Sequence, residues 1–150
     1  MTAGMKEMDP TNLKILQILQ ENGRMPFSQV GDRVGLTGPA VAERVRRMEE
    51  EGVITGYQAR VDIGLVGYPI RAYIRLQTPA ERYQRFYKTI ETIPQILECH
   101  HVTGDEAFVM FVVVESMEAL ESVIGRLSPF GETSTAVVLS TPLQRPAKLV

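Results

Sequence analysis

Three arginines lie close together in the segment from Thr37 to Glu51, whose apolar residues have the spacing of a helix. Arg46 and Arg47 fall opposite the apolar positions, and Arg44 falls on the flank. Guanidinium groups in this arrangement suit contacts with phosphates, each of which adds a salt-dependent contribution to affinity. The whole chain has 16 basic and 18 acidic residues, so nucleic-acid binding depends on this local patch and not on net charge.

A solvated helix face is the alternative interpretation of the same segment. Glu49, Glu50 and Glu51 follow the arginines, and residues 1–52 carry seven basic and eight acidic side chains. Residue types alone leave the two interpretations equally open.

The elements around this segment predict a helix-turn-helix domain over about residues 9–52. Asp9-Pro10 is an N-cap followed by proline at the first helical position, and the helix it begins ends near Asn22. A second helix over residues 27–34 is closed by Gly35, and Thr37 caps the third. The third helix directs its apolar stripe to the core through Val41, Val45 and Met48.

Beyond residue 52 the apolar period changes from helical to alternating. We expect a short strand over 57–62 and a linker marked by glycines, so that 53–69 connects two domains. The remaining elements are a strand over 70–76, a helix between Pro79 and Pro94, strands over 96–102 and 108–114, a helix after Ser116 and a strand over 133–140.

This order of strand, helix, strand, strand, helix, strand predicts a ferredoxin-like domain over 70–150, and an α+β fold for the chain. One face of its sheet has no element to cover it, so we expect dimerisation through that face.

The sequence gives no support for a metal or cofactor site. In a strand, Cys99 and His101 point to one face and His100 to the other, and no second cluster supplies further ligands. A single cysteine also excludes an internal disulfide. We expect Met48 and Met117 to lie on core stripes. With no apolar run long enough for a membrane span and no signal peptide, a cytoplasmic protein without membrane contact is expected.

Several motifs together resemble the Lrp/AsnC, or feast/famine, transcriptional regulators. They are DPTNLKILQILQENGR from Asp9, GLTGPAVAERVRRMEEEGVITGY from Gly35 and ILECHHVTGDEAFVMFVVV from Ile96, and the resemblance spans about residues 8–145. It implies a regulator that binds double-stranded DNA, responds to a small effector such as an amino acid, and forms homodimers that assemble into tetramers or octamers.

The resemblance also implies the position of the effector, beside the Gly-Asp turn and the last strand. The residues carried over are Thr103, Gly104 and Asp105 in the turn, and Thr133, Ser134 and Thr135 in the strand. An amino acid needs an anionic acceptor for its ammonium group and N–H or O–H donors for its carboxylate, and these residues supply both. An ordinary hairpin turn is the alternative interpretation.

Two departures from the family pattern affect these expectations. Glu106 and Ala107 follow the Gly-Asp pair, where the family has an aromatic and an acidic residue, and we expect Asp105 with Glu106 to favour lysine or arginine. The start of the third helix, GPAVA, carries no hydrogen-bonding side chains. Direct base contacts then depend on Thr37 and Glu43, and we expect loose sequence preference with a large contribution from DNA shape.

Two other functions remain open from the sequence. The first is an oligomeric amino-acid-binding adaptor that does not bind DNA, which fits the lack of hydrogen-bonding side chains at the start of the third helix. Some siroheme-decarboxylating enzymes share the fold, although they lack the Val-Thr-Gly-Asp turn. No catalytic motif is present, so we do not expect an enzyme.

Overall fold

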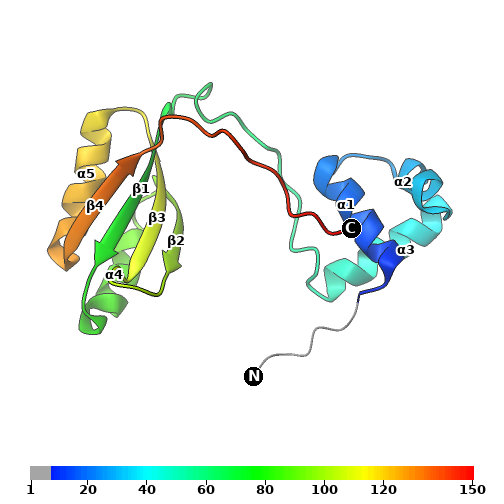
Figure 1. Ribbon diagram of the computed structural model, residues 1–150, viewed down its shortest axis with the longest axis horizontal. Coiled ribbons are helices and arrows are strands. Elements are labelled where there is room, and N and C mark those ends of the chain that lie inside the picture. The colour runs from blue at the N-terminus through cyan, green and yellow to red at the C-terminus, as the bar shows by residue number, and fades with distance from the viewer. Residues whose placement is uncertain (1–7) are drawn as a thin grey trace. The chain divides into compact units, whose positions relative to one another are not determined.

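The computed structural model describes residues 8–150, which form two compact units (Figure 1). The first unit runs to Ala59 and also includes the tail Leu143–Val150, and the second unit is Arg60–Pro142. The last eight residues therefore belong with the N-terminal unit, an arrangement that the expected boundary of 70–150 does not describe.

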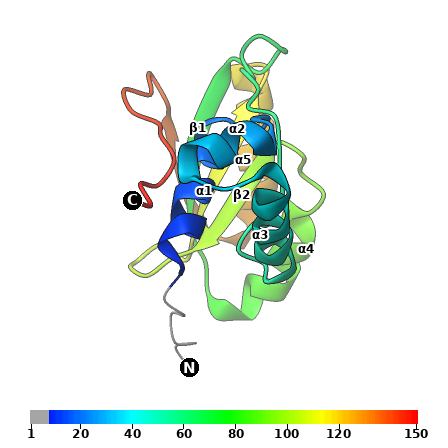
Figure 2. The ribbon, with the colours of Figure 1, turned by 90° about the vertical axis from the view of Figure 1, so that its right-hand side faces the viewer.

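The first unit is the predicted helix-turn-helix. Its helices are α1 (Pro10–Glu21), α2 (Phe27–Val34) and α3 (Gly38–Glu50), and Figure 2 looks onto them. Asp9 Oδ1 accepts from the Thr11 N–H at 2.7 Å, and Thr37 Oγ1 accepts from the Ala40 N–H at 3.3 Å. Gly35 ends α2 with a φ of 74°. The capping residues chosen from the sequence are confirmed.

A close approach between α2 and the turn before α3 fixes the angle of the motif. A Cβ on Gly31 would lie 2.3 Å from the carbonyl oxygen of Leu36, so no larger residue fits there without backbone movement. The core below is apolar and nearly solvent-free, formed by Ile15, Leu19, Val30, Val41, Val45 and Met48.

The second unit is the predicted ferredoxin-like domain. Its strands are β1 (Ile70–Gln77), β2 (Ile96–His101), β3 (Phe108–Val114) and β4 (Glu132–Val137). The sheet is antiparallel with the order β2-β3-β1-β4. The helices are α4 (Tyr83–Ile90) and α5 (Met117–Leu127), with short 3-10 turns η1 (Ala80–Arg82) and η2 (Ser128–Phe130).

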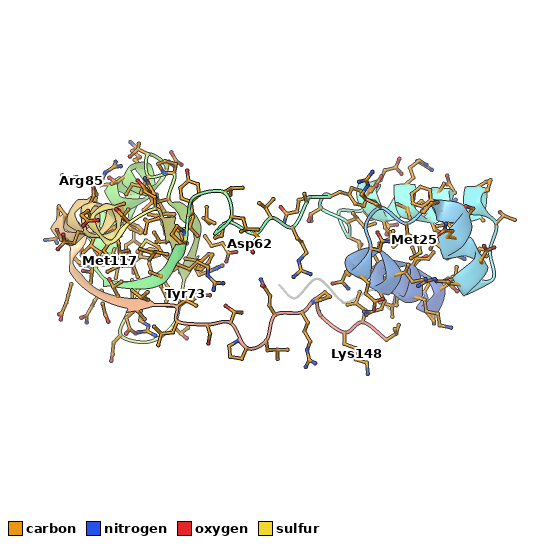
Figure 3. The ribbon with its side chains drawn as sticks, turned by 90° about the horizontal axis from the view of Figure 1, so that it is seen from above. Met25, Asp62, Tyr73, Arg85, Met117 and Lys148 are labelled. Atoms are coloured by element: carbon orange, nitrogen blue, oxygen red, sulfur yellow. The ribbon has the colours of Figure 1, made fainter. Side chains whose placement is uncertain are left out.

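Alternation along β1 separates the two faces of the sheet. Ala72, Ile74 and Leu76 are fully buried in one cluster with Phe86 of α4 and Leu120 of α5, so both helices cover that face. On the other face Tyr73, labelled in Figure 3, is 45% exposed. Its ring centroid lies 5.2 Å from that of Phe111.

Two sequence predictions about the fold are wrong. Residues 57–62 form no strand, because a strand needs a neighbour for its backbone groups and the described chain offers this segment none. Met117 is 52% exposed rather than in the core (Figure 3), since it is the first residue of α5 and the buried positions begin at Leu120. Within residues 8–150, no helix combines the length and apolarity needed to cross a bilayer.

Candidate functional site

The outward face of α3 carries an alternating chain of charges. Arg46 donates to Glu43 from Nη2 at 2.8 Å and from Nε at 3.0 Å, and its Nη1 also pairs with Glu50. Arg47 Nε donates to the same Glu43 at 2.9 Å. The side chains of Arg46 and Arg47 remain 53% and 68% exposed. The two guanidinium groups are thus accessible and held in place by neighbouring carboxylates.

These contacts set the ionisation of the face. Hydrogen bonds from Arg46, and then from Arg47, lower the pKa of Glu43 to about 2. The same pairing raises the pKa of Arg46 above its ordinary value. Glu43 is therefore charged at neutral pH and already accepts three hydrogen bonds from arginines, which leaves little of its acceptor capacity for a cytosine amino group.

Arg44 has a different environment from the other two arginines. Its Nη1 donates to Asn12 Oδ1 at 2.9 Å and to Asp9 Oδ2 at 3.2 Å, and its side chain is 34% exposed. The Thr11 N–H and then Arg44 lower the pKa of Asp9, so one carboxylate both caps α1 and fastens α3 to it. The structure directs Arg44 toward α1, away from the face that holds Arg46 and Arg47.

The N-terminal ends of α2 and α3 lie against each other. A Cβ on Gly38 would lie 3.3 Å from the Ser28 backbone nitrogen, and Thr37 and Ser28 are both exposed. Pro26 begins α2 without a side-chain cap, which leaves the first N–H groups of this helix open to an anion. Ser28 was not singled out from the sequence, although a serine just inside a helix start is a usual phosphate contact.

The turn between β2 and β3 carries the first half of the expected effector site. Thr103, Gly104 and Asp105 are exposed and Glu106 is partly so. Gly104 has a φ of 114°, which favours glycine. The loop is closed by the Val102 N–H, which donates to the Ala107 carbonyl at 3.0 Å.

The strand β4 carries the second half, and its three hydroxyls are divided between the two faces. Thr133 and Thr135 pair with Leu76 and Ile74, so they point to the helix-covered side, whereas Ser134 points to the open side. Because β1 separates β3 from β4, the turn lies at least about 10 Å from these residues across the sheet. One chain alone does not bring the expected effector residues together.

Cys99 is partly buried, whereas the two histidines that follow it, His100 and His101, are exposed. The His101 ring centroid lies 4.9 Å from that of Phe108, and His100 Nε2 lies 3.0 Å from Glu98 Oε2. Burial raises the pKa of the Cys99 thiol to about 11. No group of three or more metal-binding side chains gathers anywhere among residues 8–150.

Comparison with known proteins agrees with both units. The AsnC-type helix-turn-helix domain matches residues 8–49, and the Lrp/AsnC ligand binding domain matches residues 71–148. YezC of Bacillus subtilis, an uncharacterized HTH-type transcriptional regulator, is 38% identical over 140 residues, which cover 93% of this chain and 99% of that protein. The regulator LrpA of Mycobacterium tuberculosis is 32% identical over 138 residues, covering 89% and 91%.

The solved structure of Bacillus subtilis LrpC superposes with a TM-score of 0.86 at 30% identity, covering 93% of this chain and 99% of that one. The two matched domains define the class: a transcriptional regulator that joins a DNA-binding unit to a ligand-binding unit. The chain belongs to the Lrp/AsnC family. YezC and LrpA are both named as transcriptional regulators and not as enzymes.

Proposed function

We propose that this regulator binds duplex DNA with α3 in the major groove and with Arg46 and Arg47 on the flanking phosphates. The observation that carries the proposal is the exposed charged face of α3, whose arginines are positioned but not buried. Thr37 and Ser28, at the adjoining helix ends, supply further phosphate contacts. Arg44 holds α3 against α1 and contributes through the stability of the motif.

For Arg46, binding of this kind is an exchange of partners. A phosphate competes with Glu43 and Glu50 for Arg46, so the net gain from that contact is smaller than for a free arginine. Arg47 donates to Glu43 through Nε, and its outer nitrogens can bind a phosphate without displacing Glu43. Both contacts weaken as salt rises. The first turn of α3 has no hydrogen-bonding side chain after Thr37, so sequence preference is loose and depends on DNA shape. Fluorescence anisotropy with the protein's own upstream DNA and with a scrambled duplex tests this. A preference of many thousandfold contradicts it.

We propose an amino acid as the effector, bound between copies of the chain. A relative from Haemophilus influenzae, 30% identical over 141 residues that cover 89% of this chain and 85% of that protein, is named leucine-responsive regulatory protein. In this chain Asp105 would accept from the ligand's ammonium group, and the Gly104 N–H with the hydroxyls of β4 would donate to its carboxylate. Since one chain keeps these groups apart, a second copy has to complete the site.

The acidic pair Asp105 and Glu106 favours a ligand with a second positive charge. A thermal-shift panel of the twenty amino acids tests this preference, with Asp105→Asn as the matched variant that keeps the shape of the turn. Lysine and arginine should give the largest shifts, and these shifts should shrink in the variant. Binding of neutral amino acids without lysine or arginine contradicts the preference.

The open face of the sheet is the proposed dimer interface, and effector binding would act on assemblies of these dimers in the cytoplasm. Tyr73 and Phe111 form an aromatic pair there, and Tyr73 is exposed in the single chain. An effector that binds one assembly more tightly shifts the population toward that assembly, and the DNA affinity changes because the two assemblies bind DNA differently. Light scattering should show dimers or larger assemblies, and Tyr73→Asp should shift them to monomers. An unchanged mass for the variant contradicts this interface.

An amino-acid-binding adaptor is the second candidate function. The observation that favours it is the balanced outward face of α3, where Glu43 and Glu50 accompany Arg46 and Arg47. Effector binding in the thermal-shift panel, with no binding to any duplex even at low salt, would establish the adaptor.

A further inference from the structure

The C-terminal tail docks on the outer side of α1. Gln17 Oε1 accepts from the Leu149 N–H at 2.9 Å in a partly buried contact, and Gln20 Nε2 donates to the Ala147 carbonyl at 3.3 Å. Gln17 is itself oriented, because its Nε2 donates to Glu21 Oε1 at 3.1 Å. Two glutamines one turn apart on the helix thus bind the backbone of alternate residues of an extended segment (Figure 3 labels Lys148, which lies between them).

The other end of the same segment is fastened to the sheet. After β4 ends at Val137, the Val138 N–H donates to the Arg71 carbonyl at 2.8 Å. Arg71 Nη1 then donates to Thr141 Oγ1 at 3.0 Å. The chain between Thr141 and Ala147 is therefore held at both ends, once in each unit.

This span is the shorter of the two covalent connections between the units. Six residues lead from Thr141 to Ala147, which bounds the distance between these anchors at about 20 Å even when fully extended. Two of the residues, Pro142 and Pro146, further restrict the backbone. The linker from Tyr57 to Ile70 has thirteen residues and a reach of about 45 Å.

We propose that residues 143–150 act as a strap: they bind α1 and make the tail, rather than the longer linker, the connection that limits how far the helix-turn-helix can move from the effector unit. The strap continues directly from β4, and α1 is the helix to which Arg44 fastens α3. Once the tail is fully extended, a further separation of the two units pulls on α1 and, through Arg44, on α3. The docking stands on the hydrogen bonds alone, whereas its regulatory consequence rests on the proposed function.

Hydrogen–deuterium exchange tests the docking. A chain that ends at Pro142 should exchange the amides of α1 about tenfold faster than the full chain, since two hydrogen bonds of ordinary strength are lost, while those of α5 stay unchanged. The variant Gln17→Leu/Gln20→Leu should give the same increase in the full chain. It should add nothing in the chain that ends at Pro142, because the partner is already gone.

Gln84→Leu is the matched control, since Gln84 is an exposed glutamine of α4 whose side chain makes no hydrogen bond to any residue of the described chain 8–150. It should leave α1 exchange unchanged. Equal α1 exchange in the full and shortened chains overturns the strap. The strap is also overturned if Gln17→Leu/Gln20→Leu speeds α1 exchange as much in the chain that ends at Pro142 as in the full chain.

The regulatory consequence has its own measurement. The ratio of DNA dissociation constants with and without L-lysine or L-leucine as probe should approach one in the shortened chain. An undiminished ratio in that chain refutes the coupling, even if docking is confirmed. A ratio of one in the full chain instead counts against the proposed effector response, and the exchange data still decide the docking.

Discussion

Removing Arg47 and removing Arg44 should have different consequences, although both are arginines of α3. Arg47 is 68% exposed on the outward face, whereas Arg44 is 34% exposed and donates to Asp9 and Asn12. A phosphate contact contributes about 0.9 to the slope of log affinity against log salt. Arg47→Ala should therefore lower the slope by about 1.8 for a dimer that docks two helices.

The size of this effect is measurable. Between about 50 and about 200 mM salt, wild type should lose about 12-fold more affinity than Arg47→Ala, because the variant has fewer phosphate contacts to lose. Arg44→Ala should keep the wild-type slope and instead lower the unfolding temperature of the helix-turn-helix. The assay is fluorescence anisotropy over a salt series with one labelled duplex. Equal changes of slope for both variants, or none for Arg47→Ala, would refute the assignment of roles.

The structure supports three further predictions, on packing, on acid stability and on thiol reactivity. Gly31→Ala should lower the free energy of unfolding by about 3 kcal/mol, since its Cβ would meet the Leu36 carbonyl oxygen, while Gly125→Ala, in open space on α5, should raise it by about 1 kcal/mol. Urea unfolding measures both, and a well-tolerated Gly31→Ala contradicts the close approach. The pKa of Glu43 is lowered to about 2 by its ion pairs with Arg46 and Arg47. These ion pairs therefore stabilise the fold fully at a pH above the ordinary pKa of a glutamate, and the stabilisation is lost as the pH falls through about 2. Wild type should thus be more stable than Glu43→Gln at neutral pH and equal to it in strong acid, and a difference independent of pH argues against the ion pairs. Burial raises the pKa of the Cys99 thiol to about 11. Cys99 should therefore react with a maleimide far more slowly at neutral pH than a free cysteine does, and fast labelling contradicts its protected position.

Local chemistry made much of the fold predictable. Asp9 and Thr37 are capping residues that act on N–H groups two or three positions away, and Gly35 terminates a helix by its own backbone preference. The strand β1 was predictable in the same way, because its apolar and polar residues alternate between a buried and an open face of the sheet. In each case the determining contact lies within a few residues or one period.

What the sequence did not reveal depends on distant partners. Arg44 has the same side chain as Arg46, and only the position of Asp9, 35 residues away, directs it to α1. Residues 57–62 have a strand-like pattern but no neighbour in the described chain. Alternation alone places Ser134 on the opposite face from Thr133 and Thr135, but only the register of β4 with β1 shows which of them face the helices.

The tail was not predictable for a related reason. It is bound through its backbone carbonyl and N–H groups, which every residue has, so no side-chain pattern in residues 143–150 marks it.

In the proposed mechanism, binding of an effector to the C-terminal unit changes the affinity of α3 for DNA. The decisive experiment is to determine the dissociation constant of the full chain for duplex DNA by anisotropy, with each of the twenty amino acids in turn. At least one, with lysine and arginine foremost, should change the constant several-fold, and Asp105→Asn should reduce that change while leaving affinity without effector intact. Binding that no amino acid alters, or no binding to duplex DNA even at low salt, would contradict the coupling.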